Sequence, residues 1–193
     1  FLILYFSGVA STYINFPIAS SGQNQAYRRS LFDKVGGYSK ISHLLMGDDS
    51  IFLQLCLKAK IKVKFCLNQD SFVYCRPEKT WKSLLLQRAR WAGDGKIMWK
   101  YNFSFYLIMI STVFVNLFVI ILLFIDFGYL LASIVLIKFI FEGALAYIGS
   151  YRMNQTISIG DFIYWFILNI PYVCSMCIAS FFVRFISWKN RGN

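Results

Sequence analysis

The chain has 193 residues, of which 58% are hydrophobic and 19% aromatic, and it carries a formal net charge of +11 at pH 7. This composition excludes a single ordinary soluble globule, because soluble domains contain about 45–50% apolar residues. The five cysteines are an odd number without the dense spacing of a secreted disulfide scaffold, which excludes that class and favours reduced thiols.

Positive charge is concentrated in the first half of the chain. Residues 1–100 hold 15 Lys and Arg against 6 Asp and Glu, whereas residues 101–193 hold 5 against 3. A basic surface suits nucleic acid, an anionic membrane surface or a phosphorylated ligand. No nucleic-acid-binding motif accompanies the charge, so we expect membrane lipids and phosphorylated ligands as partners, and no nucleic acid.

The chain opens with an apolar run, Phe1–Phe6, which has no basic segment before it and is too short to span a bilayer. Because the first residue is not Met, we interpret the sequence as a fragment and not as a protein that starts with a signal peptide. Further on, Ser30–Val35 is expected to form a helical turn that ends at Gly36-Gly37, and Ile51–Ala59 to form a helix.

A strand is expected at Ile61–Phe65, where apolar residues alternate with polar ones. Together with the helices, this alternation predicts an α/β fold, of which residues 1–80 would be only part of one domain. Lysines at a spacing of two would form either a solvated strand face or a membrane-facing patch. They are Lys58, Lys60, Lys62 and Lys64.

Two adjacent carboxylates, Asp48 and Asp49, stand directly before the second helix and after Gly47. One of them can act as an N-cap, since an Asp oxygen accepts unpaired backbone N–H groups at a helix start. A second adjacent carboxylate suffers like-charge repulsion and has no evident structural benefit, so a chemical role is the alternative interpretation.

Residues 81–100 predict an amphipathic helix that lies on the membrane surface, because Trp and Leu side chains are interspersed with Lys and Arg. Three longer apolar segments follow, each near the roughly 20 residues that cross a bilayer. They are Phe103–Ile125, Phe127–Ile148 and Phe162–Trp188. Pro171 could break the third into a re-entrant piece, so residues 101–193 are expected to hold about three transmembrane or re-entrant helices.

Basic residues set the expected orientation of these spans. Lys96, Lys100 and Arg152 flank the first two spans on one side, which the positive-inside rule assigns to the cytoplasm. The protein is therefore expected to cross the inner or plasma membrane several times, with the basic half cytoplasmic. Within the second span, Lys138 and Glu142 lie four residues apart and are expected to neutralise each other.

Four motifs, in this order and spacing, resemble the C-terminal part of family 2 membrane glycosyltransferases, the group that includes cellulose, chitin and hyaluronan synthases. Each motif alone is weak, but their combination is specific, and the resemblance is close over residues 15–100. The motifs are Ser21-Gly22-Gln23-Asn24 with the residues up to Arg29, Val35-Gly36-Gly37-Tyr38, Gly47-Asp48-Asp49, and Gln87-Arg88-Ala89-Arg90-Trp91.

The resemblance implies a GT-A fold and an inverting transfer of a sugar from a nucleotide-sugar donor to an acceptor hydroxyl. It makes Asp49 the general base and Asp48 a residue that orients the acceptor. It divides the chain into a partial cytoplasmic catalytic domain with the acceptor half (1–80), an interfacial helix with the QxxRW motif (81–100) and the membrane helices (101–193). Of the QxxRW motif, Gln87 and Arg90 would hold the donor diphosphate, which an Arg fork suits, and Trp91 would pack beside the acceptor sugar.

The same resemblance places Gly22 and Asn24 near the acceptor pocket. It also implies a divalent metal, Mg²⁺ or Mn²⁺, held by an Asp-x-Asp motif that this sequence lacks. We therefore expect the metal only in the full-length protein, and we expect the fragment alone to be inactive because its donor-binding half is absent.

The sequence leaves other interpretations open. A non-catalytic multi-pass membrane scaffold or transporter fragment with a basic lipid-binding domain would explain the charge and the apolar segments, but not the order of the motifs. Within the enzyme interpretation, the acceptor is either a growing polysaccharide or a lipid-linked molecule. QxxRW favours a processive synthase, whereas the small number of candidate spans favours a single transfer.

Overall fold

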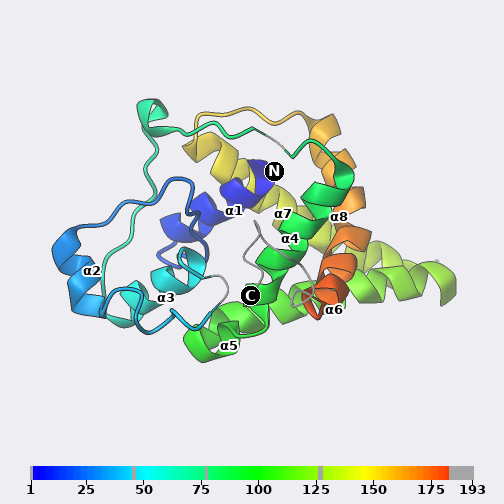
Figure 1. The fold of residues 1–193 in the computed structure, drawn as a ribbon. Coiled ribbons are helices and arrows are strands. Elements are labelled where there is room, and N and C mark those ends of the chain that lie inside the picture. Colours follow the sequence, from blue (N-terminus) through cyan, green and yellow to red (C-terminus); the bar gives the residue numbers. More distant parts are fainter. Residues whose placement is uncertain (1, 45–46, 77, 126–127, 183–193) are drawn as a thin grey trace. The chain divides into compact units, whose positions relative to one another are not determined.

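The computed structural model describes residues 2–44, 47–76, 78–125 and 128–182 (Figure 1). The chain divides into two compact units. Unit 1 comprises residues 1–75 and 139–159, and unit 2 comprises residues 76–138 and 160–193. The helices are α1 (Leu2–Tyr13), α2 (Arg29–Val35), α3 (Ser50–Lys58), the 3₁₀ turn η1 (Gln69–Ser71), α4 (Trp81–Gly95), α5 (Met98–Tyr101), α6 (Phe103–Ile125), α7 (Tyr129–Arg152) and α8 (Ile159–Ser180).

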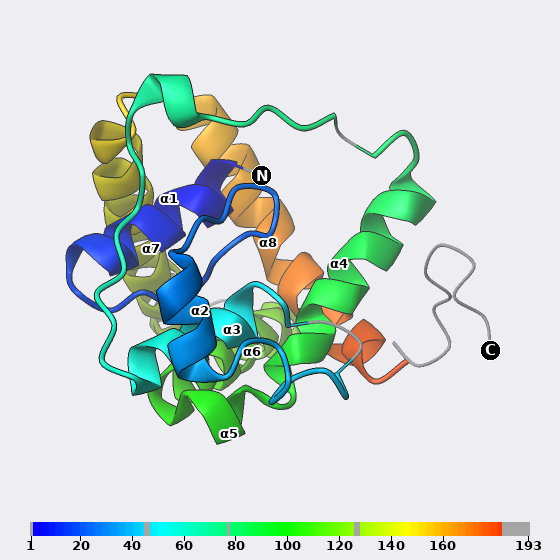
Figure 2. The ribbon, with the colours of Figure 1, turned by 60° about the vertical axis from the view of Figure 1, so that its left-hand side comes forward.

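In unit 1, α1 packs closely against the second half of α7 (Figure 2). Phe6, Val9 and Ala10 on α1 are buried, and Gly149 of α7 lies directly against the backbone of Phe6. A Cβ atom at position 149 would clash with Phe6, so the absence of a side chain there permits the close approach. The sequence indicated only a short apolar run at the first residues and did not predict α1.

The two predicted helices of unit 1 are confirmed as α2 and α3. Helix α2 ends at Gly36, whose φ of +86° is the left-handed conformation that glycine adopts without strain. Helix α3 buries Ile51, Phe52, Leu53 and Cys56. Because Asp49 is the N-cap of α3, burial of this face fixes the helix that begins directly after the Asp48-Asp49 pair.

The expected strand at 61–65 is not formed, and the described residues contain no strand (Figure 2). Over the described part of the chain this corrects the α/β expectation, because the ordered elements there are helical. The alternation itself persists: Ile61, Val63 and Phe65 are half-buried, whereas Lys62 and Lys64 are exposed. A strand also needs a partner for its backbone hydrogen bonds, and periodicity in one segment does not show whether a partner exists.

Unit 2 contains α4, α5, α6, the first half of α7 and α8. Buried side chains of α6 and α7 form an apolar cluster, with Ile170 of α8 against it. Its buried members are Val119, Leu122 and Leu131. Lys138, also buried on α7, places its ammonium nitrogen 4.2 Å from the ring centroid of Phe166 on α8. The expected pairing of Lys138 with Glu142 stays a prediction.

Three helices of the described chain, α6, α7 and α8, are long and apolar enough to cross a membrane. The first predicted span coincides with α6, and the second begins two residues before α7 and ends four residues before its end. Helix α8 continues through Pro171 without the break that the sequence allowed. The predicted third span extended to Trp188, and its last six residues lie outside the described residues.

Candidate functional site

Asp49 is the N-cap of α3, and both oxygens of its carboxylate accept backbone hydrogen bonds. Oδ1 accepts from the N–H of Ser50 at 2.5 Å, and Oδ2 accepts from the N–H of Gly22 at 3.1 Å. The capping interpretation of the sequence is therefore confirmed for Asp49. A carboxylate has about four acceptor sites, so these two bonds orient Asp49 and leave it able to accept a proton.

Gly47 adopts the backbone conformation that places Asp48 and Asp49 at the start of α3. Its φ is +108°, a value that side-chain-bearing residues rarely adopt, and a Cβ there would clash with Ile51. The carbonyl of Gly47 accepts a hydrogen bond from the N–H of Phe52 at 3.0 Å, which joins the turn to the helix. Asp48 is exposed beside it, whereas the neighbouring Asp49 is half-buried.

Two side-chain hydrogen bonds anchor the loop that carries Gly22 and Asn24. The side chain of Asn24 donates to the carbonyl of Ser71 at 2.7 Å, and the Tyr5 hydroxyl of α1 donates to Oε1 of Gln23 at 3.0 Å. The bond to Ser71 crosses 47 residues of sequence, so Asn24 joins the loop to η1. Asn24 therefore has a structural contact besides any role toward an acceptor.

An aromatic cluster that the sequence did not reveal lies next to the aspartate pair. Phe52 of α3 is fully buried, and its ring centroid lies 5.0 Å from that of Tyr27 and 5.3 Å from that of Tyr38. Phe32 of α2 completes the cluster, with its centroid 5.5 Å from that of Tyr27. Tyr27 and Tyr38 both stand in the quoted motifs, so their position there was the signal available from sequence.

The hydroxyl groups of Tyr27 and Tyr38 are 2.7 Å apart and hydrogen-bonded. This bond raises the pKa of Tyr38 from 10.0 to about 12, and burial, the charge on Tyr27 and the charges of Asp48 and Asp49 act in the same direction. The negative charges act on Tyr38 because the phenolate would be a like charge near them. The hydroxyl of Tyr38 thus lies near both carboxylates.

Helix α4 carries the Gln87, Arg90 and Trp91 positions in unit 2. A capping box starts the helix: the Thr80 side chain accepts from the N–H of Ser83 at 3.1 Å, and Oγ of Ser83 accepts from the N–H of Thr80 at 3.4 Å. This cap satisfies N–H groups that a helix start leaves unpaired. It stabilises the first turn of the helix on which the three residues stand.

The three QxxRW side chains have distinct surroundings. Gln87 donates from Nε2 to Oε1 of Glu78 at 3.1 Å. Trp91 is 39% exposed, and the guanidinium of Arg88 lies 4.3 Å from its ring centroid. Desolvation lowers the pKa of Arg90 from 12.5, while Glu78 acts in the opposite direction. An arginine at this position remains charged near neutral pH.

A family model described as "Glycosyl transferase family group 2" matches residues 2–183. The chain belongs to this family. No curated protein and no solved structure matches it. The match supports transferase activity with sugar donor and acceptor substrates, and it confirms the resemblance at the level of the family. It does not distinguish cellulose, chitin and hyaluronan synthases from other members.

In this member of the glycosyltransferase family, Gly22 and Asp49 lie together although they are 27 residues apart in the sequence. Asn24 and Asp48 belong to the same unit, whereas Gln87, Arg90 and Trp91 belong to unit 2. The predicted site residues thus form two groups, one in each unit.

No group of three or more His, Cys, Asp or Glu side chains suitable for a metal ion occurs in residues 2–44, 47–76, 78–125 and 128–182. The five cysteines, which include Cys174 and Cys177, are all free thiols. The divalent cation that the resemblance implies therefore stays a prediction.

Proposed function

We propose that the full-length protein transfers a sugar, with inversion, from a nucleotide-sugar donor to a hydroxyl of a polysaccharide or lipid-linked acceptor, with Asp49 as the general base. The observation that carries the proposal is the hydrogen bond from the N–H of Gly22 to Asp49. It joins two of the four motifs at one carboxylate, in a chain that belongs to a glycosyltransferase family.

The chemistry requires an oriented carboxylate. An acceptor hydroxyl that attacks an anomeric carbon in line must lose its proton to a base within hydrogen-bond reach. Asp49 suits this role because two backbone N–H groups hold its carboxylate in one orientation and lone pairs remain. Asp48 is exposed next to it and would orient the acceptor hydroxyl.

For the donor, we propose that Gln87 and Arg90 bind the diphosphate and that Trp91 packs beside the acceptor sugar. A charged guanidinium offers paired donors to phosphate oxygens and stabilises the negative charge that develops on the leaving diphosphate. The side chain of Trp91 is partly exposed and offers a ring on which a sugar can stack. The guanidinium of Arg88 lies against that ring.

A divalent cation, Mg²⁺ or Mn²⁺, belongs to this proposal as a cofactor of the full-length protein, held by residues outside this chain. When bound, such an ion would neutralise charge on the donor diphosphate. By the same reasoning, this chain would be inactive alone. Mixing it with the complementary donor-binding part would restore activity only if the two associate.

We also propose a cytoplasmic position for the Asp49 region, in the inner or plasma membrane. The support is the basic charge of residues 1–100 and the three membrane-length helices that follow. A cytoplasmic site has direct access to nucleotide sugars. Labelling of the exposed free thiols of Cys66 and Cys75 from either side of sealed vesicles tests this orientation.

The decisive experiment measures sugar transfer by the full-length protein in membranes, with a panel of radiolabelled nucleotide sugars. Asp49→Asn is the informative variant: Asn also caps helices and is a very weak base, and its single amide oxygen can accept only one of the two backbone hydrogen bonds that Asp49 accepts. We expect it to keep the membrane level of the protein and to lower transfer about 100-fold to 10,000-fold. Trp91→Ala is expected to lower transfer as well.

Asp33→Asn is the matched control. It removes one carboxylate from unit 1 that pairs with Arg29 on the exposed face of α2, at 3.3 Å. Such a surface pair contributes little, so transfer should be unchanged. Full transfer by Asp49→Asn, or no transfer from any donor, would instead favour the non-catalytic membrane scaffold or transporter.

A further inference from the structure

A second cavity lies within unit 1, away from the aspartate pair, with a volume of about 280 Å³. It is lined by the C-terminal part of α1, by the extended segment 62–67 and by Arg152 at the end of α7. Its lining combines the positive charges of Arg152, Lys62 and Lys64 with apolar side chains such as Val63 and Phe65. No carboxylate occurs among the described residues of this lining.

Arg152 is held in place by an aromatic ring. Its guanidinium carbon lies 3.6 Å from the ring centroid of Tyr13, which is 56% exposed. Stacking on a ring orients the guanidinium plane and leaves its edge available for hydrogen bonds. The segment 62–67 also lines the cavity, with Lys62 and Lys64 at its exposed positions and Val63 and Phe65 at its half-buried ones.

The position of the cavity relative to the membrane follows from the length of α7. This helix has 24 residues and is long and apolar enough to cross a membrane. Its length of about 36 Å slightly exceeds the hydrocarbon thickness of about 30 Å, so its last residue belongs at the polar boundary. Tyr147 and Tyr151 are exposed and stacked on each other within the last two turns of α7, and tyrosines are typical of that boundary.

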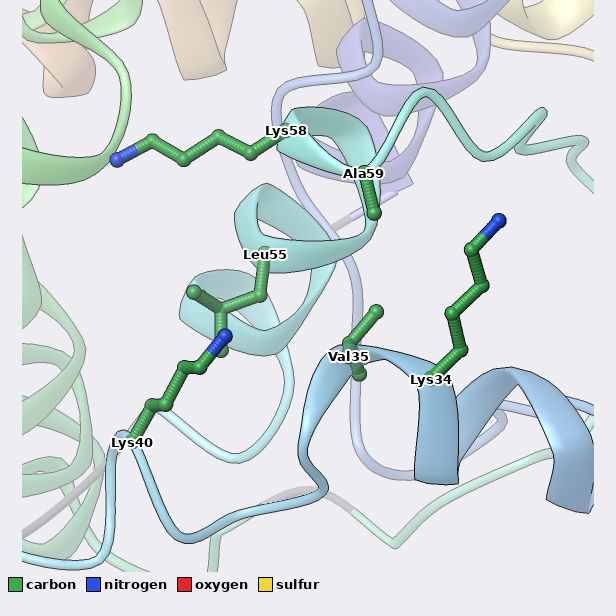
Figure 3. A pocket seen from close by; sticks show the side chains of 6 residues that line it. All are labelled: Lys34, Val35, Lys40, Leu55, Lys58 and Ala59. Carbon is green, nitrogen blue, oxygen red and sulfur yellow. The ribbon is translucent and has the colours of Figure 1, made fainter.

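The other cavity in unit 1 also carries lysines, but their arrangement differs. Lys34, Lys40 and Lys58 line it together with side chains of α2 and α3. The side chains of Lys34 and Lys58 extend away from each other, so their ammonium groups do not converge on one ligand (Figure 3). Neither residue stands at the end of a membrane-length helix.

We propose that the cavity lined by Arg152, Lys62 and Lys64 binds the headgroup of an anionic membrane phospholipid. The phosphate is bound by Arg152 with Lys62 and Lys64, and the glycerol region lies against Val63 and Phe65. Basic pockets at the ends of membrane helices recognise lipid headgroups by this combination of charge and apolar contact. The site is independent of sugar transfer, since it uses none of the residues assigned to donor, acceptor or base.

Native mass spectrometry of the full-length protein in detergent tests the proposal, with dihexanoyl phosphatidylglycerol as the probe and dihexanoyl phosphatidylcholine as the neutral comparison. The protein should retain the anionic lipid preferentially. Each Lys or Arg near such a headgroup contributes about 1 kcal/mol, or roughly fivefold in affinity. Lys62→Gln with Arg152→Gln should therefore weaken retention about 25-fold, and Arg152→Lys should restore most of the loss from Arg152→Gln.

Two comparisons can overturn the proposal. Lys34→Gln with Lys40→Gln removes the same charge from the other cavity and should leave retention unchanged; an equal loss would mean unspecific attraction to the basic half. Glycerol phosphate carries the phosphate without acyl chains and should compete poorly. If it or a nucleoside diphosphate displaces the lipid at equal concentration, the cavity is a site for soluble anions and not for lipid.

Discussion

Gly22 donates its backbone N–H to Oδ2 of Asp49 at 3.1 Å. Because position 22 lies in a loop and position 49 caps a helix, this bond connects two segments that are 27 residues apart in sequence. The donor is a backbone group, so the side chain at position 22 can change while the donor stays. A hydrogen bond to a charged group contributes about 1.5–3 kcal/mol, enough to fix the carboxylate.

Gly22→Pro should lower sugar transfer, because proline has no N–H to donate to Asp49. The loss corresponds to roughly 10-fold to 150-fold, from the energy of one charge-assisted hydrogen bond. Gly22→Ala is the control, since it keeps the donor and its Cβ would lie 3.7 Å from Oδ2 of Asp49, an ordinary contact. Equal transfer by the two variants would show that this bond does not position the carboxylate.

Tyr27→Phe should lower the pKa of Tyr38 from about 12 towards 10.0, because the hydrogen bond with Tyr27 is the largest cause of the shift. Nuclear magnetic resonance with isotope-labelled tyrosine can follow Tyr38 separately from the other tyrosines. The raised pKa means that folding favours the neutral hydroxyl. The associated stability is present below about pH 10 and is lost as the pH rises through about 12.

Asp48→Asn should lower the pKa of Tyr38 by a smaller amount, since the charge of Asp48 is a lesser cause of the shift. The same resonance measurement gives this difference. An unchanged pKa of Tyr38 in both Tyr27→Phe and Asp48→Asn would contradict the placement of the tyrosine pair beside the carboxylates.

Gly149→Ala should destabilise unit 1, although alanine is the better helix former by about 1 kcal/mol. The new methyl group would meet the backbone of Phe6, and overpacking of this kind costs about 1–3 kcal/mol. Thermal unfolding in detergent gives the difference. Gly95→Ala is the matched control on α4, because its Cβ would make only an ordinary contact of 3.7 Å with Met109. A stabilising Gly149→Ala would show that α1 does not pack against α7.

Thr80→Ala should loosen the first turn of α4, because it removes the capping box with Ser83. Losing such a cap costs about 1 kcal/mol, which would raise amide hydrogen exchange at Ser83 and Leu84 roughly fivefold. Thr80→Ser keeps the accepting hydroxyl and should behave as the wild type. Unchanged exchange in Thr80→Ala would mean that packing alone holds this turn.

Several elements could be predicted from the sequence because their signals are local. The span Phe103–Ile125 follows from its length and composition, and α2 and α3 follow from apolar spacing and the glycines at 36 and 37. The four motifs, read in order, led to the glycosyltransferase family that residues 2–183 match. Each of these conclusions uses information contained within one stretch of chain or in the order of stretches.

The tertiary structure decided features that depend on contacts between distant residues. Helix α1 is stabilised by burial against α7, where Gly149 admits the Phe6 backbone, and no pattern within residues 2–13 reports that partner. The alternating segment 61–65 lacks a neighbouring strand among the described residues, so its periodicity led to half-burial without a sheet. The Tyr27–Tyr38 hydroxyl pair and the Gly22–Asp49 bond are likewise long-range contacts. Composition and periodicity determined which segments are apolar. Hydrogen bonding and close packing between segments determined which secondary structure those segments adopt and what they pack against.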